Sequence, residues 1–187
     1  AGSKALAASC DALTAQTVYE RPLPEDLAAE VYRLRQRMEK EIGKENAQHH
    51  NIKTGRGGMV DVEFLVQYLQ LLHAGNHLEL RSQNTLRVLK QLENQELLTP
   101  HDSGVLIEGY KFLRRLENKL RLIHDQTISQ LSGDAKALRR VALSLGYPAR
   151  PKPPETLFLE EYRRTTESIR ALFAFYLEGQ NEHDGDR

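Results

Sequence analysis

Apolar residues recur every three or four positions along most of this 187-residue chain, and that helical period constrains the fold more than any other feature. The residue types agree with it. The chain has 29 Leu against 14 Val plus Ile, and β-branched residues are the ones that strands favour. A chain of this length forms one compact core. We therefore predict an all-α fold, a bundle of about six mostly antiparallel helices.

Six segments are assigned as helices. The first is amphipathic and ends at Gly43, with Arg35 among the residues on its polar faces. The second is apolar on nearly all sides, which predicts a central, buried helix. Ser82 and Thr99 are candidate capping residues for the third and fourth. The predicted helices cover residues 25–42, 61–72, 82–95, 99–126, 134–145 and 156–178.

The two ends of the chain lack this pattern. Residues 1–22 are small and weakly patterned and end in a proline-rich segment, so we expect a connector there. Residues 23–178 are predicted to form the helical bundle. Residues 179–187 are polar and are predicted to be a disordered tail.

Charge and composition exclude several classes of function. Acidic and basic residues number 26 each, so no overall field would draw the chain to nucleic acid or to an anionic membrane. No apolar run is long enough to span a bilayer, and we expect a cytoplasmic protein. The lone Cys10 excludes an internal disulfide. Without a nucleophile elbow or a complete set of metal ligands in the sequence, we assign no catalytic residue and no metal site.

The segment that could carry chemistry is a glycine-rich basic loop, residues 53–58, which leads directly into the central helix. Glycine N–H groups can approach an anion closely, and a helix N-terminus adds a partial positive potential. The loop could therefore bind a phosphate. The alternative is that the glycines only let the loop pack tightly. The candidate cofactor-binding residues are Lys53, Arg56, Gly57 and Gly58.

Two acidic residues follow the loop, Asp61 and Glu63. On a strand they would share a face and could hold Mg²⁺. On a helix, positions i and i+2 diverge by about 200°, so we do not expect them to chelate one ion. Their simpler role is to offset the helix dipole.

The string IKTGRGGMVDVEFLVQYLQL, residues 52–71, resembles the signature of the helical domain of glutamine synthetase adenylyltransferases (glutamate-ammonia-ligase adenylyltransferases). That domain is related to one in PII uridylyltransferases. The resemblance continues through residues 80–102 and 108–126 and covers roughly residues 22–177. The VDVEF string resembles the C-terminal, adenylylating half of these enzymes more than the deadenylylating half.

The resemblance implies a two-headed enzyme in which each half has a nucleotidyltransferase domain followed by a helical domain. One half attaches AMP to a tyrosine of glutamine synthetase and the other removes it, with ATP and Mg²⁺. The family's catalytic Gly-Ser turn and paired aspartates belong to the preceding domain, and Gly2-Ser3 is not followed by such a pair. We therefore interpret residues 1–22 as a tail from a preceding nucleotidyltransferase domain and expect the isolated chain to lack catalysis.

Three roles remain open. The loop residues 53–58 could form an edge facing the nucleotide or the catalytic domain. The chain could instead be a regulatory module that binds PII protein, glutamine or glutamine synthetase, or a structural spacer between the two halves. The arginine pairs either decorate solvated faces or mark a partner surface. These pairs are Arg114-Arg115, Arg139-Arg140 and Arg163-Arg164.

Overall fold

The computed structural model describes residues 2–43, 45, 49–124 and 130–178, and within them it confirms the all-α prediction. Seven α-helices and one pair of three-residue strands account for the regular structure of these residues, together with a π-helix, η1 (Glu39–Gly43), and a 3₁₀ turn, η2 (Leu78–Leu80). The helices are α1 (Lys4–Val18), α2 (Leu27–Met38), α3 (Met59–His73), α4 (Thr85–Asn94), α5 (Pro100–His124), α6 (Ala135–Leu145) and α7 (Pro154–Glu178).

Helix α3 is central, as its all-round apolar sequence predicts. Val62 and Leu65 are fully buried, and Tyr68 and Leu69 are 3% exposed. The helix packs against α2, α4, α5 and α7. An apolar surface on every side of a helix is buried only when neighbours lie on every side, so α3 organises the core.

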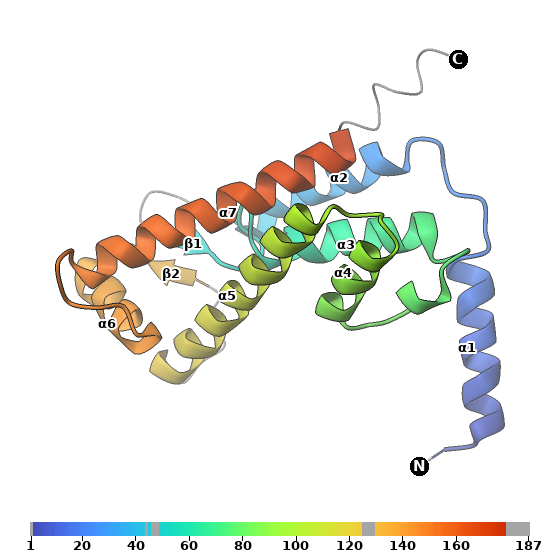
Figure 1. Cartoon of the computed structure of the whole chain (residues 1–187), viewed down its shortest axis with the longest axis horizontal. Helices are drawn as coiled ribbons and strands as arrows, with labels where there is room; N and C mark the ends of the chain where they lie inside the picture. The colour runs from blue at the N-terminus through green and yellow to red at the C-terminus, as the bar shows by residue number, and fades with distance from the viewer. Residues whose placement is uncertain (1, 44, 46–48, 125–129, 179–187) are drawn as a thin grey trace.

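The two longest helices, α5 and α7, pack against each other and frame the molecule (Figure 1). Their stripes bury the residues that the helical period indicated, including Leu113 and Leu116 of α5 and Ile169 and Phe173 of α7. Helix α6 packs near one end of α7 and α2 near the other. No helix in the described part of the chain is long and apolar enough to cross a membrane.

Helix α1 is the seventh helix, in a segment that we interpreted as a connector. None of its residues is buried, and it projects from one end of the bundle (Figure 1). Its sequence is rich in alanine, which has the highest helix propensity, and Ser3 caps its first turn. Propensity and capping account for this helix without a buried face. Residues 179–187, the predicted tail, lie outside the described residues, as do residues 125–126 of the predicted fourth helix.

The helix ends follow capping chemistry, with one correction. Thr99 accepts a hydrogen bond from the Asp102 N–H at 3.1 Å, and Gly146 ends α6 in the left-handed region at φ 93°. The predicted cap at Ser82 is wrong. Asn84 accepts from the Arg87 N–H at 3.0 Å, because the 3₁₀ turn before it moves the start of α4 two residues along the chain.

A short antiparallel strand pair holds the start of the loop. Strand β1 (His49–Asn51) pairs with β2 (Gln130–Ser132), and His50 lies opposite Leu131. Leu131 is 1% exposed, so the pair is anchored in the core. The glycine-rich loop therefore begins at a fixed point beside α6 rather than in a free connection.

Candidate functional site

The glycine-rich loop folds back on itself, and its backbone N–H groups have acceptors within the chain. The N–H groups of Gly55 and Gly58 donate to the carbonyls of Asn51 and Gly55, at 2.8 and 3.0 Å. The next two N–H groups, of Met59 and Val60, donate to carbonyls of residues 52 and 53 at 3.1 and 3.0 Å. The first N–H groups of α3 therefore donate to carbonyl groups of the loop that precedes the helix.

Gly57 joins the loop to α7. Its φ is +68°, and a Cβ atom there would stand 2.8 Å from the Cα of Thr166 and nearer still to the carbonyl of that residue. The absence of a side chain is therefore required twice, for the left-handed backbone and for the contact with α7. Gly58 is similar in its close approach, since a Cβ there would lie 2.5 Å from the carbonyl oxygen of Lys53.

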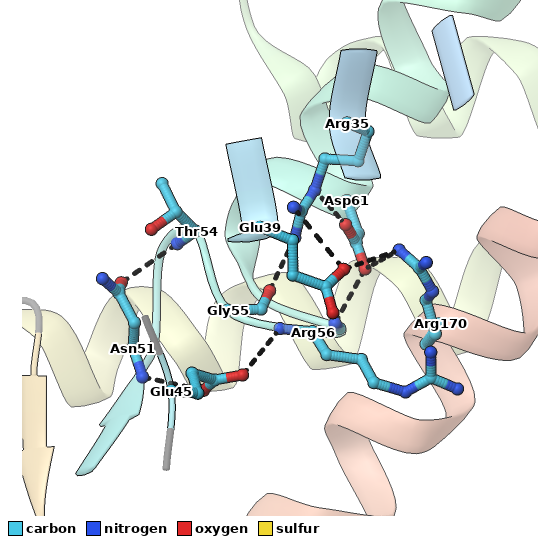
Figure 2. Close-up of polar contacts among 10 residues, drawn as sticks. Arg35, Glu39, Glu45, Asn51, Thr54, Gly55, Arg56, Asp61 and Arg170 are labelled. Atoms are coloured by element: carbon cyan, nitrogen blue, oxygen red, sulfur yellow. Dashed lines mark hydrogen bonds and ion pairs between the residues drawn. The ribbon is translucent and has the colours of Figure 1, made fainter. Parts of the chain in front are cut away.

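Four charged side chains from α2, η1, α3 and α7 converge behind the loop (Figure 2). We call Arg35, Glu39, Asp61 and Arg170 the buried ion cluster. Arg35 contacts Asp61 directly through Nε and Oδ1, and its Nη1 lies 3.8 Å from a Glu39 carboxylate oxygen. Arg170 Nη1 lies 3.3 Å from Glu39 Oε2 and 3.5 Å from Asp61 Oδ2.

Three of the four side chains in the cluster are almost completely removed from solvent, and the Glu39 side chain is 24% exposed. Arg35 and Asp61 are 0% exposed and Arg170 is 4% exposed. Burial raises the pKa of the Asp61 carboxyl, whereas the two guanidinium groups and the Gly57 N–H act in the opposite direction. Removing one partner of such a group costs about 3–5 kcal/mol, because a charge is left buried without its counterpart.

The same cluster fixes the backbone on both sides of Arg56. Arg35 Nη2 donates to the Gly55 carbonyl at 2.6 Å, and the Gly57 N–H donates to Asp61 Oδ2 at 2.7 Å. The Arg56 N–H itself donates to Glu45 Oε2 at 3.0 Å (Figure 2). The Arg56 side chain is exposed, so it is a solvent-facing cation on a backbone held at three successive residues.

Lys53 lies in a second charged group. Its Nζ is 2.8 Å from Glu117 Oε1, and the same carboxylate contacts Arg114 at 3.0 Å and Arg121 at 2.8 Å. Glu117 and Arg121 are four positions apart on α5, a spacing that brings side chains of a helix together. Burial opposes ionisation of Glu117, but Lys53 and the two arginines outweigh it and hold its pKa below the ordinary value.

This geometry defines which chemistry the loop residues can perform. Gly57 and Gly58 shape the loop and pack it, with their N–H groups donating to Asp61 and Gly55. A phosphate at this edge would be contacted by the side chain of Arg56, with Lys53 held by Glu117. Asp61 and Glu63 diverge, since Asp61 joins the ion cluster and Glu63 accepts a 2.8 Å hydrogen bond from Tyr110. In the described residues no group of three His, Cys, Asp or Glu side chains could hold a metal ion.

Sequence reasoning missed the residues that fix the loop. We placed Arg35 on a polar face of its helix, but Arg35 is fully buried and the neighbouring apolar Leu34 is 46% exposed. The buried face of α2 is therefore rotated from the face that the sequence indicated. The sequence feature that could have placed Arg35 on the buried face is its position four residues after Val31. Nothing in the local pattern indicated Arg170, which reaches the cluster from α7.

Comparison with known proteins gives one family match. The family described as GlnD PII-uridylyltransferase matches residues 25–177, which include the loop, the ion cluster and the helices α2 to α6 with nearly all of α7. Helix α1 lies outside the matched range.

Curated relatives that carry the name bifunctional glutamine synthetase adenylyltransferase/adenylyl-removing enzyme are similar over much of the chain, and three of them illustrate the match. The protein from Stenotrophomonas maltophilia is 39% identical over 64% of this chain and 13% of its own length. That from Bradyrhizobium diazoefficiens is 31% identical over 88% of this chain and 16% of its length. That from Pseudomonas putida is 34% identical over 79% of this chain and 15% of its own length. The chain therefore spans about a seventh of these relatives.

Proposed function

The chain belongs to the GlnD PII-uridylyltransferase family, and from this membership we propose that it acts as the helical domain of a bifunctional glutamine synthetase adenylyltransferase/adenylyl-removing enzyme. In that role it supports ATP-dependent transfer of AMP to a tyrosine of glutamine synthetase. It does so beside a nucleotidyltransferase domain of the same polypeptide, in the cytoplasm. The VDVEF string favours the adenylylating half as its context.

The observation that carries the proposal is the fixed presentation of Arg56. An exposed arginine normally loses side-chain and backbone freedom when it binds an anion. Here the peptide groups around it are already held by Arg35, Asp61 and Glu45, so the backbone part of that ordering is complete before any ligand arrives. A guanidinium carried on a preorganised backbone is suited to phosphoryl oxygens or to a carboxylate of an adjoining domain.

The proposed division of labour gives this chain no catalytic residue. Arg56 stabilises negative charge on the nucleotide or on the facing domain. Lys53, which lies beside Glu117, adds a second positive charge. Gly57 and Gly58 keep the loop close to α7 and to residue 53. In this proposal the magnesium ion and the reacting groups belong to the preceding domain.

The test is a charge reversal in the full-length enzyme. Arg56→Glu is expected to lower kcat/KM for ATP in the adenylylation of glutamine synthetase by about tenfold or more, since it replaces a stabilising charge with a repelling one. The matched control is Arg87→Glu, an exposed arginine on α4 with the same charge change. Equal rates and equal ATP KM values for Arg56→Glu and wild type would identify the loop as a spacer. Adenylylation of glutamine synthetase by the isolated chain with Mg·ATP would refute the assignment of catalysis to the preceding domain.

We extend the proposal to a second partner, the PII regulatory protein, because the matching family is described by an activity on PII. Binding is measured by isothermal titration of the isolated chain with PII, with and without glutamine. Heat of binding that persists in Arg56→Glu would place PII on another surface. A titration without heat would remove PII from the partners of this domain and leave the adenylylation proposal intact.

A further inference from the structure

A cleft of about 630 Å³ lies between α5 and α7. Phe112, which is 7% exposed, gives it an apolar base, and Val105 continues that base along α5. Gly109 lets the two helices approach, since a Cβ at this position would lie 2.9 Å from Ile169 Cδ1. From residue 105 to residue 115 the cleft follows α5 for about 15 Å, at the rise of an α-helix.

Arginines from two of the three arginine pairs line this cleft, one from each wall. Arg115 comes from α5 and Arg164 from α7, and both are exposed. Among the described residues neither has an ion-pair partner within 4 Å. Both also act on one hydroxyl: burial and Glu161 raise the pKa of Tyr147, and the charges of the two arginines lower it.

The other charged residues of the cleft are already engaged. Lys111 Nζ lies 2.8 Å from Glu108 Oε1, and Glu161 accepts a 2.6 Å hydrogen bond from the Tyr147 hydroxyl. Because that hydroxyl is neutral, Glu161 keeps its negative charge. Two arginines against this one carboxylate leave the lining with a net positive charge, with one arginine on each wall above an apolar base. An interaction surface of this kind suits a ligand that carries carboxylates on either side of an apolar group.

We propose that the cleft between α5 and α7 binds an extended acidic segment of a partner protein, with carboxylates on Arg115 and Arg164 and an apolar side chain on Phe112. The length of the cleft favours a segment over a small anion. An isolated exposed ion pair contributes little, about 0–1 kcal/mol, so a single phosphate at one arginine would bind weakly. A segment engages both arginines and the apolar base together.

The experiment measures fluorescence anisotropy of a labelled peptide in which glutamates flank a leucine, titrated with the 187-residue chain at low salt. The double variant Arg115→Glu/Arg164→Glu is expected to weaken binding by about tenfold or more, because attraction on both walls becomes repulsion. The matched control is Arg140→Glu/Arg163→Glu. It makes the same charge change with one arginine from each of two pairs, and neither residue lines the cleft. Circular dichroism verifies that both variants remain helical.

Three results would overturn the proposal. One is equal affinity of the wild type and the Arg115/Arg164 variant for the acidic peptide. Another is equal binding of the same peptide with glutamine in place of glutamate. The last is full displacement of the peptide by millimolar inorganic phosphate, which would assign the cleft to a small anion. None of these readouts involves AMP transfer, so they leave the proposed function of the loop untouched.

Discussion

Replacing Gly57 with alanine tests the idea that the loop is a fixed clamp on α7. An alanine at φ +68° costs about 1–2 kcal/mol of backbone strain. Its Cβ would stand 2.8 Å from Thr166 Cα, and relieving that overlap costs about 1–3 kcal/mol more. Any shift of the loop also lengthens the 2.7 Å hydrogen bond between the Gly57 N–H and Asp61. We expect Gly57→Ala to lower the free energy of unfolding by about 3 kcal/mol, which lies within the sum of about 2–5 kcal/mol for the two costs.

The measurement is urea unfolding followed by far-UV circular dichroism. With an m value of about 2 kcal/mol per molar urea, the expected loss moves the midpoint down by about 1.5 M. Gly104→Ala is the control, because a Cβ at Gly104 in α5 meets no atom within 4 Å and its φ is not positive. This substitution should raise stability by about 0.5–1 kcal/mol, since alanine favours helix over glycine.

A loss below about 0.5 kcal/mol for Gly57→Ala, with an unchanged m value, would refute the clamp. Gly57→Asn separates the two costs. Asparagine tolerates the left-handed region better than alanine but carries the same Cβ. If the overlap with Thr166 dominates, the asparagine and alanine variants lose similar stability, whereas a clearly milder asparagine variant would assign the cost to backbone strain.

Three other predictions follow from the charged groups and the caps. Asp61→Asn should cost about 3–5 kcal/mol in urea unfolding, because Arg35 is left buried beside a neutral amide. The interactions that lower the pKa of Glu117 contribute stability that is fully present above pH 4.5 and is lost as pH falls through the folded pKa; the unfolding midpoint of Glu117→Gln should therefore converge on that of wild type only below the folded pKa. Asn84→Ala should cost about 1 kcal/mol and Ser82→Ala less, and thermal melts giving the reverse order would restore Ser82 as the cap of α4.

The helices could be predicted from sequence because each leaves a local signal. Period, proline and caps depend on residues a few positions apart, and they located α2 to α7 to within a few residues. Helix α1 left no periodic signal, since no buried face imposes a period on it. The strand pair β1–β2 was equally hidden, because its partners are about 80 residues apart and each strand has only three residues.

The position of the candidate site in the chain could be predicted from sequence, but the side chains that hold it in place could not. The glycines and basic residues of 53–58 identified the loop, whereas the groups that fix it come from α2, η1, α3, α7 and residue 45. Arg170 lies 109 residues after Asp61, and its reach into the cluster depends on how α7 crosses α3. The amphipathic pattern of α2 also misled, since a buried arginine with a buried partner reads as a polar residue in the sequence.

The energetics of the buried ion cluster indicate what it contributes. Desolvating Arg35, Asp61 and Arg170 costs several kcal/mol per charge, and well-packed apolar residues would often be as stable. The cluster therefore contributes more to the position of the loop than to the stability of the fold. Arg35 holds the Gly55 carbonyl and Asp61 holds the Gly57 N–H, so the cluster sets where the peptide units before and after Arg56 lie. An apolar core could fill the same space without directing either group. The buried charges are therefore costly for stability, and what they add is one fixed position for the backbone of the exposed Arg56 on the surface of the domain.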